Sequence, residues 1–209
     1  MPERDDRIAR IAQKLLKVPQ PVDDLTSLRP DWEPLVPLDR PPVEAAVLIA
    51  LVRREEGYAV LYTQRATTLR SHSGQIAFPG GKIDPGDADA AAAALREAEE
   101  EVALVPADAE IIGYMPTYFT GTNYLITPVV AVIEPSAPFV ANPFEVDAVF
   151  EVPLPLIARV ETYGTYRVHR GSVEHRTWQI DHEGRVIWGI TANLTRQFRD
   201  MALNGEDGW

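Results

Sequence analysis

A run of charged residues near the middle of the chain has the residue types and spacing needed to bind a divalent metal ion. Glu97, Glu100 and Glu101 are three and four positions apart, so on a helix their carboxylates leave the same face. Like charges at this spacing repel each other, and a bound cation would remove that repulsion. Carboxylate oxygens are the ligands that hard cations such as Mg²⁺ prefer. Taken alone, such a run is more often a solvated acidic helix face.

Two neighbouring features favour metal binding over a solvated face. Arg96 precedes the first glutamate, where its planar guanidinium can hold carboxylates in a fixed arrangement. Ahead of the helix, Gly80 and Gly81 predict a turn whose backbone amides and carbonyl are not shielded by side chains. We therefore expect the metal ligands to be the carboxylates of Glu97, Glu100 and Glu101, with the carbonyl of Gly81 as a further ligand.

The same region resembles the sequence box of the Nudix hydrolases, G-x5-E-x7-R-E-U-x-E-E-x-G-U, in which U is an apolar residue. The matching residues are Gly81, Arg96, Glu97, Ala98, Glu100, Glu101 and Leu104. The chain departs from the box in three places. Asp87 stands where the first Glu would be, the stretch from it to Arg96 is one residue longer, and Ala103 replaces the late Gly. The departures leave the helical acids intact, and we assign no role to Asp87.

A second motif, just upstream, resembles the coenzyme A pyrophosphatase branch of this family. The branch signature runs L-L-T-x-R-S, a short spacer, and G-x3-F-P-G-G. The chain matches it from Leu61 to Arg65 and from Gly74 to Gly81, with Tyr62 and Ala66 as departures. The resemblance implies an α/β/α sandwich with a mixed sheet. It also implies cleavage of coenzyme A or acyl-CoA to 3′,5′-ADP and (acyl-)4′-phosphopantetheine.

Hydrolysis of a phosphoric anhydride needs an activated water, neutralised phosphoryl charge and a stabilised leaving group, and bound Mg²⁺ or Mn²⁺ can supply all three. The residues expected to take part in catalysis are Arg96, Glu97, Glu100, Glu101 and Glu145. Glu145 lies in a loop that could reach the site, although a solvent-exposed loop carboxylate is an equally good interpretation. The residues expected to bind substrate are Arg65, Arg70, Gly80, Gly81 and Lys82. Arg65 and Arg70 could bind the diphosphate or the 3′-phosphate of coenzyme A, or be ordinary exposed side chains.

Two alternative functions remain open. One is a Nudix pyrophosphatase for another nucleoside diphosphate derivative, such as ADP-ribose or a dinucleotide, since pocket shape rather than motif decides the substrate. The other is a domain that senses a nucleotide without cleaving it. The retention of all three helical acids favours an enzyme.

Composition excludes several other function classes. With 31 acidic and 20 basic residues the net charge is −11, which argues against a nucleic-acid-binding surface. The absence of cysteine excludes disulfides, a thiol nucleophile and a zinc–thiolate site. No apolar run reaches the ~20 residues that span a bilayer, and the charged N-terminus lacks the apolar core of a secretory signal. We expect a cytoplasmic protein that binds a small molecule and no membrane.

The elements that must position these residues indicate an α+β fold. Residues 1–42 are expected to form an N-terminal helix and a Pro-rich extended arm, and residues 43–209 the Nudix domain. The N-terminal helix could cap the core or contribute to a homodimer. The expected helices are 8–16, 88–103 and 191–203, and the expected strands are 45–51 and 57–63 (as a hairpin), 111–116, 126–133, 148–152, 166–169, 177–180 and 186–189.

Overall fold

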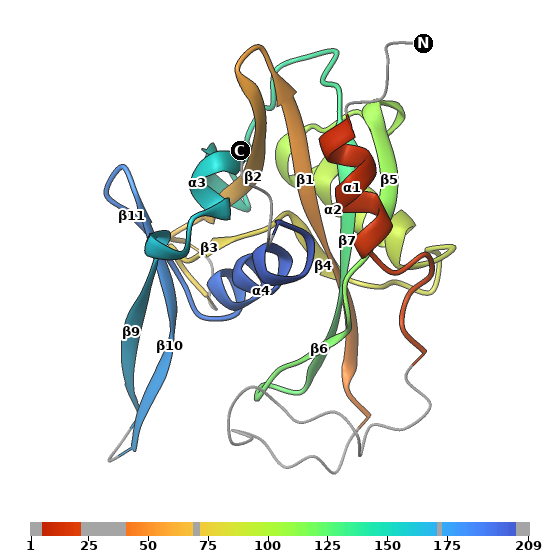
Figure 1. The fold of residues 1–209 in the computed structure, drawn as a ribbon. Coiled ribbons are helices and arrows are strands. Elements are labelled where there is room, and N and C mark those ends of the chain that lie inside the picture. The colour runs from red at the N-terminus through yellow and green to blue at the C-terminus, as the bar shows by residue number, and fades with distance from the viewer. Residues whose placement is uncertain (1–5, 22–40, 69–71, 171–172, 204–209) are drawn as a thin grey trace.

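The computed structural model describes residues 6–21, 41–68, 72–170 and 173–203 (Figure 1). Its centre is a mixed sheet in the order β3-β2-β1-β7-β5, with β4 paired to β1, β6 to β7 and β8 to β2. β1 and β7 are parallel and the other pairs are antiparallel. The strands are β1 (Val43–Arg54), β2 (Gly57–Arg65), β3 (Ile76–Ala77), β4 (Gly80–Lys82), β5 (Ala109–Tyr114), β6 (Tyr118–Phe119), β7 (Tyr124–Ile133) and β8 (Val146–Pro153).

A second, antiparallel sheet follows in the chain. It has the order β11-β10-β9, from β9 (Tyr163–Arg170), β10 (Val173–His182) and β11 (Arg185–Trp188). The helices are α1 (Asp6–Lys14), α2 (Ala90–Val102), α3 (Leu154–Ala158) and α4 (Ile190–Phe198), the last continued by a π-helical turn over Arg199–Leu203. No helix in the described ranges is both long and apolar enough to span a lipid bilayer.

Helices cover both faces of the central sheet, which confirms the α/β/α sandwich. β1 is buried on both faces, so its sequence is a continuous apolar run rather than an alternating one. Ala45, Ile49 and Leu51 face one core with α1, α3 and α4. Leu48 and Val52 face the other core with α2. Figure 1 shows α1 and α4 in front of the sheet and α2 behind it.

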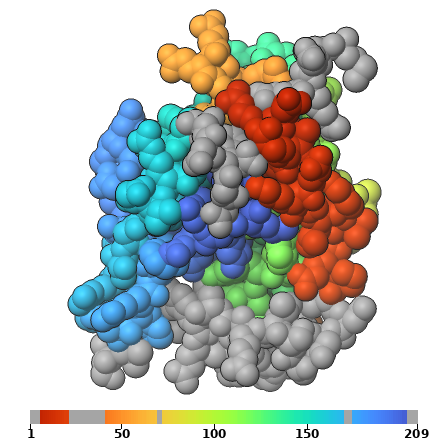
Figure 2. Space-filling view, in the orientation of Figure 1, coloured from red at the N-terminus to blue at the C-terminus, as the bar shows by residue number. Residues whose placement is uncertain are grey.

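The N-terminal helix is part of the main core. Ile8, Ile11 and Leu15 are buried, and Leu16 forms a β-bridge with Tyr114. The Lys14 ammonium donates to the carbonyl of Ala202, and in the space-filling view the N-terminal and C-terminal segments lie against each other (Figure 2). The helix therefore caps the core, which is one of the two roles expected for it. Residues 22–40, most of the predicted arm, lie outside the described residues.

Most predicted elements are confirmed, including the hairpin of β1 and β2, but the expected turn at Gly80 and Gly81 is wrong. These residues form β4, which pairs with β1. The physical reason is close packing: Gly80 has a φ of +156°, and a Cβ there would overlap the carbonyl oxygen of Ala46. Glycine is the residue that fits both constraints. The short elements β3, β6 and α3 were also not predicted.

Candidate active site

Helix α2 orients the acids by burying its alanine face. The Asp89 carboxylate caps the N-terminus by accepting from the Ala92 amide at 2.8 Å, a contact typical of stable helix starts. Ala94 and Ala98 are fully buried against β1 and β7. With that face fixed, the three glutamates meet different environments, from Glu101, which is buried, to Glu100, which is exposed.

Glu101 is the most buried of the acids, with a side chain only 4% exposed. One carboxylate oxygen lies 3.8 Å from a guanidinium nitrogen of Arg65, and the other accepts a 3.4 Å hydrogen bond from the Gly80 amide. Burial raises the pKa of Glu101 to about 8; Arg65 and the Gly80 amide oppose this, while the charges of Glu97 and Glu145 add to it. Without a bound cation, burial therefore disfavours the charged form of this carboxyl.

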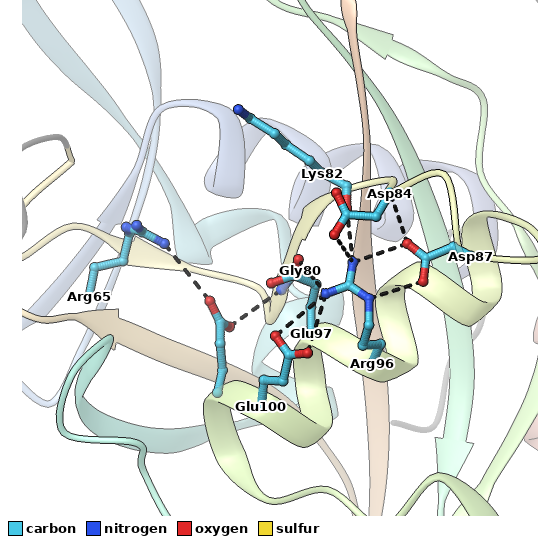
Figure 3. Close-up of polar contacts among 9 residues, drawn as sticks. Arg65, Gly80, Lys82, Asp84, Asp87, Arg96, Glu97 and Glu100 are labelled. Carbon is cyan, nitrogen blue, oxygen red and sulfur yellow. Dashed lines mark hydrogen bonds and ion pairs between the residues drawn. The ribbon is translucent and has the colours of Figure 1, made fainter.

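Glu97 and Glu100 are held by Arg96 (Figure 3). The guanidinium donates to Glu97 at 3.0 Å and to Glu100 at 3.4 Å. Burial raises the pKa of Glu97, although Arg96 opposes the shift. The Glu97 carboxylate also packs so closely on Gly81 that a Cβ there would overlap it. Arg96 thus supplies the positive charge that two of the three acids need.

Asp87 is a functional candidate that the sequence did not reveal. Its carboxylate accepts two hydrogen bonds from the Arg96 guanidinium, both 3.0 Å, and one from the Asp84 amide at 2.8 Å. The hydrogen bonds from Arg96 and then Asp84 lower the pKa of Asp87. Arg96 also donates to the Lys82 carbonyl at 3.1 Å. The altered spacing of the sequence box hid this pairing, which depends on the path of the loop before α2.

Asp87→Asn is expected to lower kcat/KM about 10- to 100-fold, the range typical of residues that orient metal ligands. Arg96 would lose its charged, two-point partner, so Glu97 and Glu100 would lose their fixed support. Steady-state kinetics on a nucleoside diphosphate substrate, with circular dichroism for the fold, measures this. The control is Asp84→Asn, because its carboxylate is 66% exposed and 3.8 Å from Arg96. Equal activity in the two variants would contradict a positioning role for Asp87.

The predicted substrate-binding residues differ in their surroundings, and Gly81, as described above, packs against the Glu97 carboxylate. Arg65 ends β2 beside Glu101, and its Nε is buried without a hydrogen-bond partner among the described residues. Gly80 is already bonded to Glu101. The Lys82 side chain is exposed and extends away from the acids in Figure 3. Arg70 lies outside the described residues.

Glu145, the fifth catalytic candidate, lies close to the helical acids. Its charge contributes to the raised pKa of both Glu97 and Glu101. The turn that carries it is bonded to the end of α2 through Asn142, whose amide donates to the Glu101 carbonyl at 2.9 Å. The fold therefore brings a carboxylate from outside α2 into the electrostatic field of the site.

Helix α4 is hydrogen-bonded to β2 and β3, the strands that carry part of the signature segment (residues 61–81). The sequence did not reveal these contacts. The Thr191 hydroxyl donates to the Ile76 carbonyl of β3 at 2.9 Å, and the Thr195 hydroxyl is 2.9 Å from that of Tyr62 on β2. Both contacts are buried, where an unpaired polar group is costly. No local signal in the sequence identified these hydroxyls as anchors, because their partners lie more than 100 residues away along the chain.

The donor set fits a divalent metal ion in its chemistry. The acids offer hard oxygen ligands. Burial and neighbouring negative charges raise the pKa of Glu97 and Glu101, and a bound cation would offset both effects by stabilising the charged carboxylates. In the part of the chain that the structure describes, no three His, Cys, Asp or Glu side chains are gathered as a ready metal site. The carboxylates pair with Arg96 and Arg65 instead. The assignment of Gly81, Glu97, Glu100 and Glu101 as ligands stays a prediction.

Comparison with known proteins places the chain in a family. The NUDIX domain family matches residues 42–164, so the chain belongs to the Nudix family and is a hydrolase of nucleoside diphosphate derivatives. Among its relatives is the uncharacterized Nudix hydrolase NudL of Escherichia coli K12, 47% identical over 154 residues, which are 74% of this chain and 80% of the relative. NudL of Cronobacter sakazakii is 46% identical over the same shares of the two chains.

Solved structures of similar fold include an Ap4A hydrolase from Caenorhabditis elegans. It has a TM-score of 0.46 and 21% identity over 54% of this chain and 81% of that one. DR0079 from Deinococcus radiodurans has a TM-score of 0.47 and 18% identity over 74% of this chain and 82% of that one.

Proposed function

We propose that this Nudix hydrolase cleaves the diphosphate of coenzyme A or its acyl derivatives, giving 3′,5′-ADP and (acyl-)4′-phosphopantetheine, with Mg²⁺ or Mn²⁺ as cofactor. One observation carries the proposal. The segment that resembles the coenzyme A branch, residues 61–81, contacts the Glu101 carboxylate at two points. Arg65 lies 3.8 Å from Glu101, and the Gly80 amide donates to the same carboxylate. The signature and the acidic helix thus belong to one site.

The site residues are proposed to have three roles: binding the metal ion, accepting a proton and positioning the carboxylates. Glu97, Glu100 and Glu101, with the Gly81 carbonyl, would hold the cation, which when bound supplies an acidified water and neutralises phosphoryl charge. Glu145 accepts the proton of the attacking water, because it is the acid from outside α2 whose charge reaches Glu97 and Glu101. Arg96 holds two of the carboxylates in place.

Arg65 binds the anionic substrate in this scheme. Its side chain is 28% exposed and lies beside Glu101. An acidic protein needs local positive charge to bind a diphosphate, and charge-assisted hydrogen bonds from arginine meet that need. Arg70 is proposed as the second cation, directed to the 3′-phosphate.

The proposal is tested by incubating the protein with Mg²⁺ and coenzyme A and detecting 3′,5′-ADP by chromatography. We expect coenzyme A to be turned over faster than ADP-ribose and faster than dinucleotides such as NADH. Arg65→Gln should raise KM about 10- to 100-fold, the effect of losing a charged hydrogen bond. Arg70→Ala should reduce the preference for coenzyme A over dephospho-coenzyme A.

Faster cleavage of another member of that panel would replace coenzyme A with that substrate. Binding of nucleotides without cleavage of any would indicate the sensing alternative. If Arg70→Ala leaves the preference for the 3′-phosphate unchanged, this residue does not recognise it.

A further inference from the structure

The turn that carries Glu145 is tied on both sides to elements of the active site. At one side, the Asn142 amide donates to the Glu101 carbonyl (2.9 Å) at the end of α2. At the other side, the Ala66 amide, next to Arg65, donates to the Glu145 carbonyl at 2.8 Å. Within the turn, the Glu145 amide donates to the Asn142 carbonyl at 3.0 Å. The turn is therefore fixed relative to both Glu101 and Arg65.

Phe144 lies in the middle of this turn and projects into solvent. Its amide donates to the Asn142 side-chain oxygen at 3.2 Å, so its backbone is held too. The residue is 83% exposed, the highest value among the large apolar residues that the structure describes. Exposed apolar surface is unfavourable in water. A ring on a backbone that is already ordered, however, loses little conformational freedom when a ligand packs on it.

We propose that Phe144 is a substrate-contacting residue whose ring packs against an uncharged, flat or apolar group attached to the diphosphate. Phe144 is the immediate neighbour of Glu145, in a turn that is bonded both to the Glu101 carbonyl and to the amide that follows Arg65. The turn therefore borders the residues proposed to hold the metal ion and the diphosphate. The identity of that group rests on the proposed function: in coenzyme A the two arms carry an adenine ring and a pantetheine chain.

The test compares Phe144→Ala with Phe144→Tyr in steady-state kinetics. Removal of the ring should raise KM about 5- to 50-fold, the effect of losing one aromatic stacking partner, with a much smaller change in kcat. The tyrosine variant, which keeps a ring, should restore the wild-type KM. The urea midpoint of Phe144→Ala should equal that of the wild type, because the exposed ring contributes little to folding. Val160→Ala, which removes another exposed apolar side chain (60%), should change neither measurement.

Two calorimetric titrations in Mg²⁺ separate the arms of the substrate. Weaker binding of ADP to Phe144→Ala assigns the ring to the base, and weaker binding of 4′-phosphopantetheine assigns it to the other arm. Unchanged binding of both ligands, with an unchanged KM, overturns the proposal. If the wild type does not cleave coenzyme A, the proposed function fails alone. Phe144 is then tested with the best diphosphate substrate of the panel and with ADP.

Discussion

Glu101→Gln is expected to lower kcat about 1,000-fold or more, the effect of losing a charged group from a catalytic centre, while the fold stays intact. The buried carboxylate sits between Arg65 and the Gly80 amide, where the signature segment meets α2. Glutamine keeps the shape and the hydrogen-bonding oxygen but lacks the negative charge that a cation needs. Turnover is measured with saturating Mg²⁺, and circular dichroism reports the fold.

The same substitution should change how the stability of the metal-free protein depends on pH. The pKa of Glu101 is about 8 in the folded protein, against an ordinary value of 4.5. Between these values the folded protein holds a proton that the unfolded chain has released, so stability falls as the pH rises through this window. The expected loss is about 2–4 kcal/mol. Glu101→Gln should remove it, and urea unfolding at about pH 5.5 and pH 9 measures both proteins.

Glu99→Gln is the matched control, because Glu99 is exposed on the same helix. It should retain turnover and the wild-type pH dependence of stability. Added Mg²⁺ at high pH should raise the urea midpoint of the wild type more than that of Glu101→Gln, since a ligand stabilises the state that binds it. Wild-type turnover in Glu101→Gln, or equal responses to Mg²⁺, would remove Glu101 from the proposed ligand set.

Gly80→Ala is expected to destabilise the protein by about 3–5 kcal/mol, from backbone strain and overpacking together. The residue has a φ of +156°, and its Cβ would overlap the Ala46 carbonyl and crowd Val47 on β1. To relieve this contact β4 must move from β1, and the Gly80 amide would then move away from Glu101. Turnover should therefore fall together with the urea midpoint.

The control for this variant is Gly86→Ala. Gly86 has an ordinary φ and open space where the Cβ would stand, so its free energy of unfolding should stay within about 0.5 kcal/mol of wild type. A Gly80→Ala protein with wild-type stability would show that β4 can shift without cost. That result would contradict the close packing of β4 on β1.

The features that the sequence predicts correctly are those set by residues close together in the chain. The alanine-rich stretch and the spacing of Glu97, Glu100 and Glu101 define a helix with acids on it, and α2 is confirmed within two residues at its start. The continuous apolar run of β1 likewise predicts a buried strand. Both depend on neighbours within a few positions along the chain.

The rest depends on contacts between distant segments. The buried Glu101 carboxylate contacts Gly80 of β4 and Arg65 at the end of β2, and no property of α2 alone reveals these neighbours. The pairing of Asp87 with Arg96 depends on a loop conformation that spacing rules do not describe. The strand at Gly80 was predicted as a turn because glycine pairs usually mark turns, whereas here the missing side chain serves close packing against β1.

Helix α4 holds two strands of the signature segment, so it affects whether the Nudix-matched segment is stable without the rest of the chain. The Nudix match ends at residue 164, yet Thr191 and Thr195 lie beyond it and hold Ile76 and Tyr62 through buried hydroxyls. A chain cut at the family boundary would leave the Ile76 carbonyl without that partner. We therefore expect the segment matched by the Nudix family to be less stable alone than in the chain that includes α4.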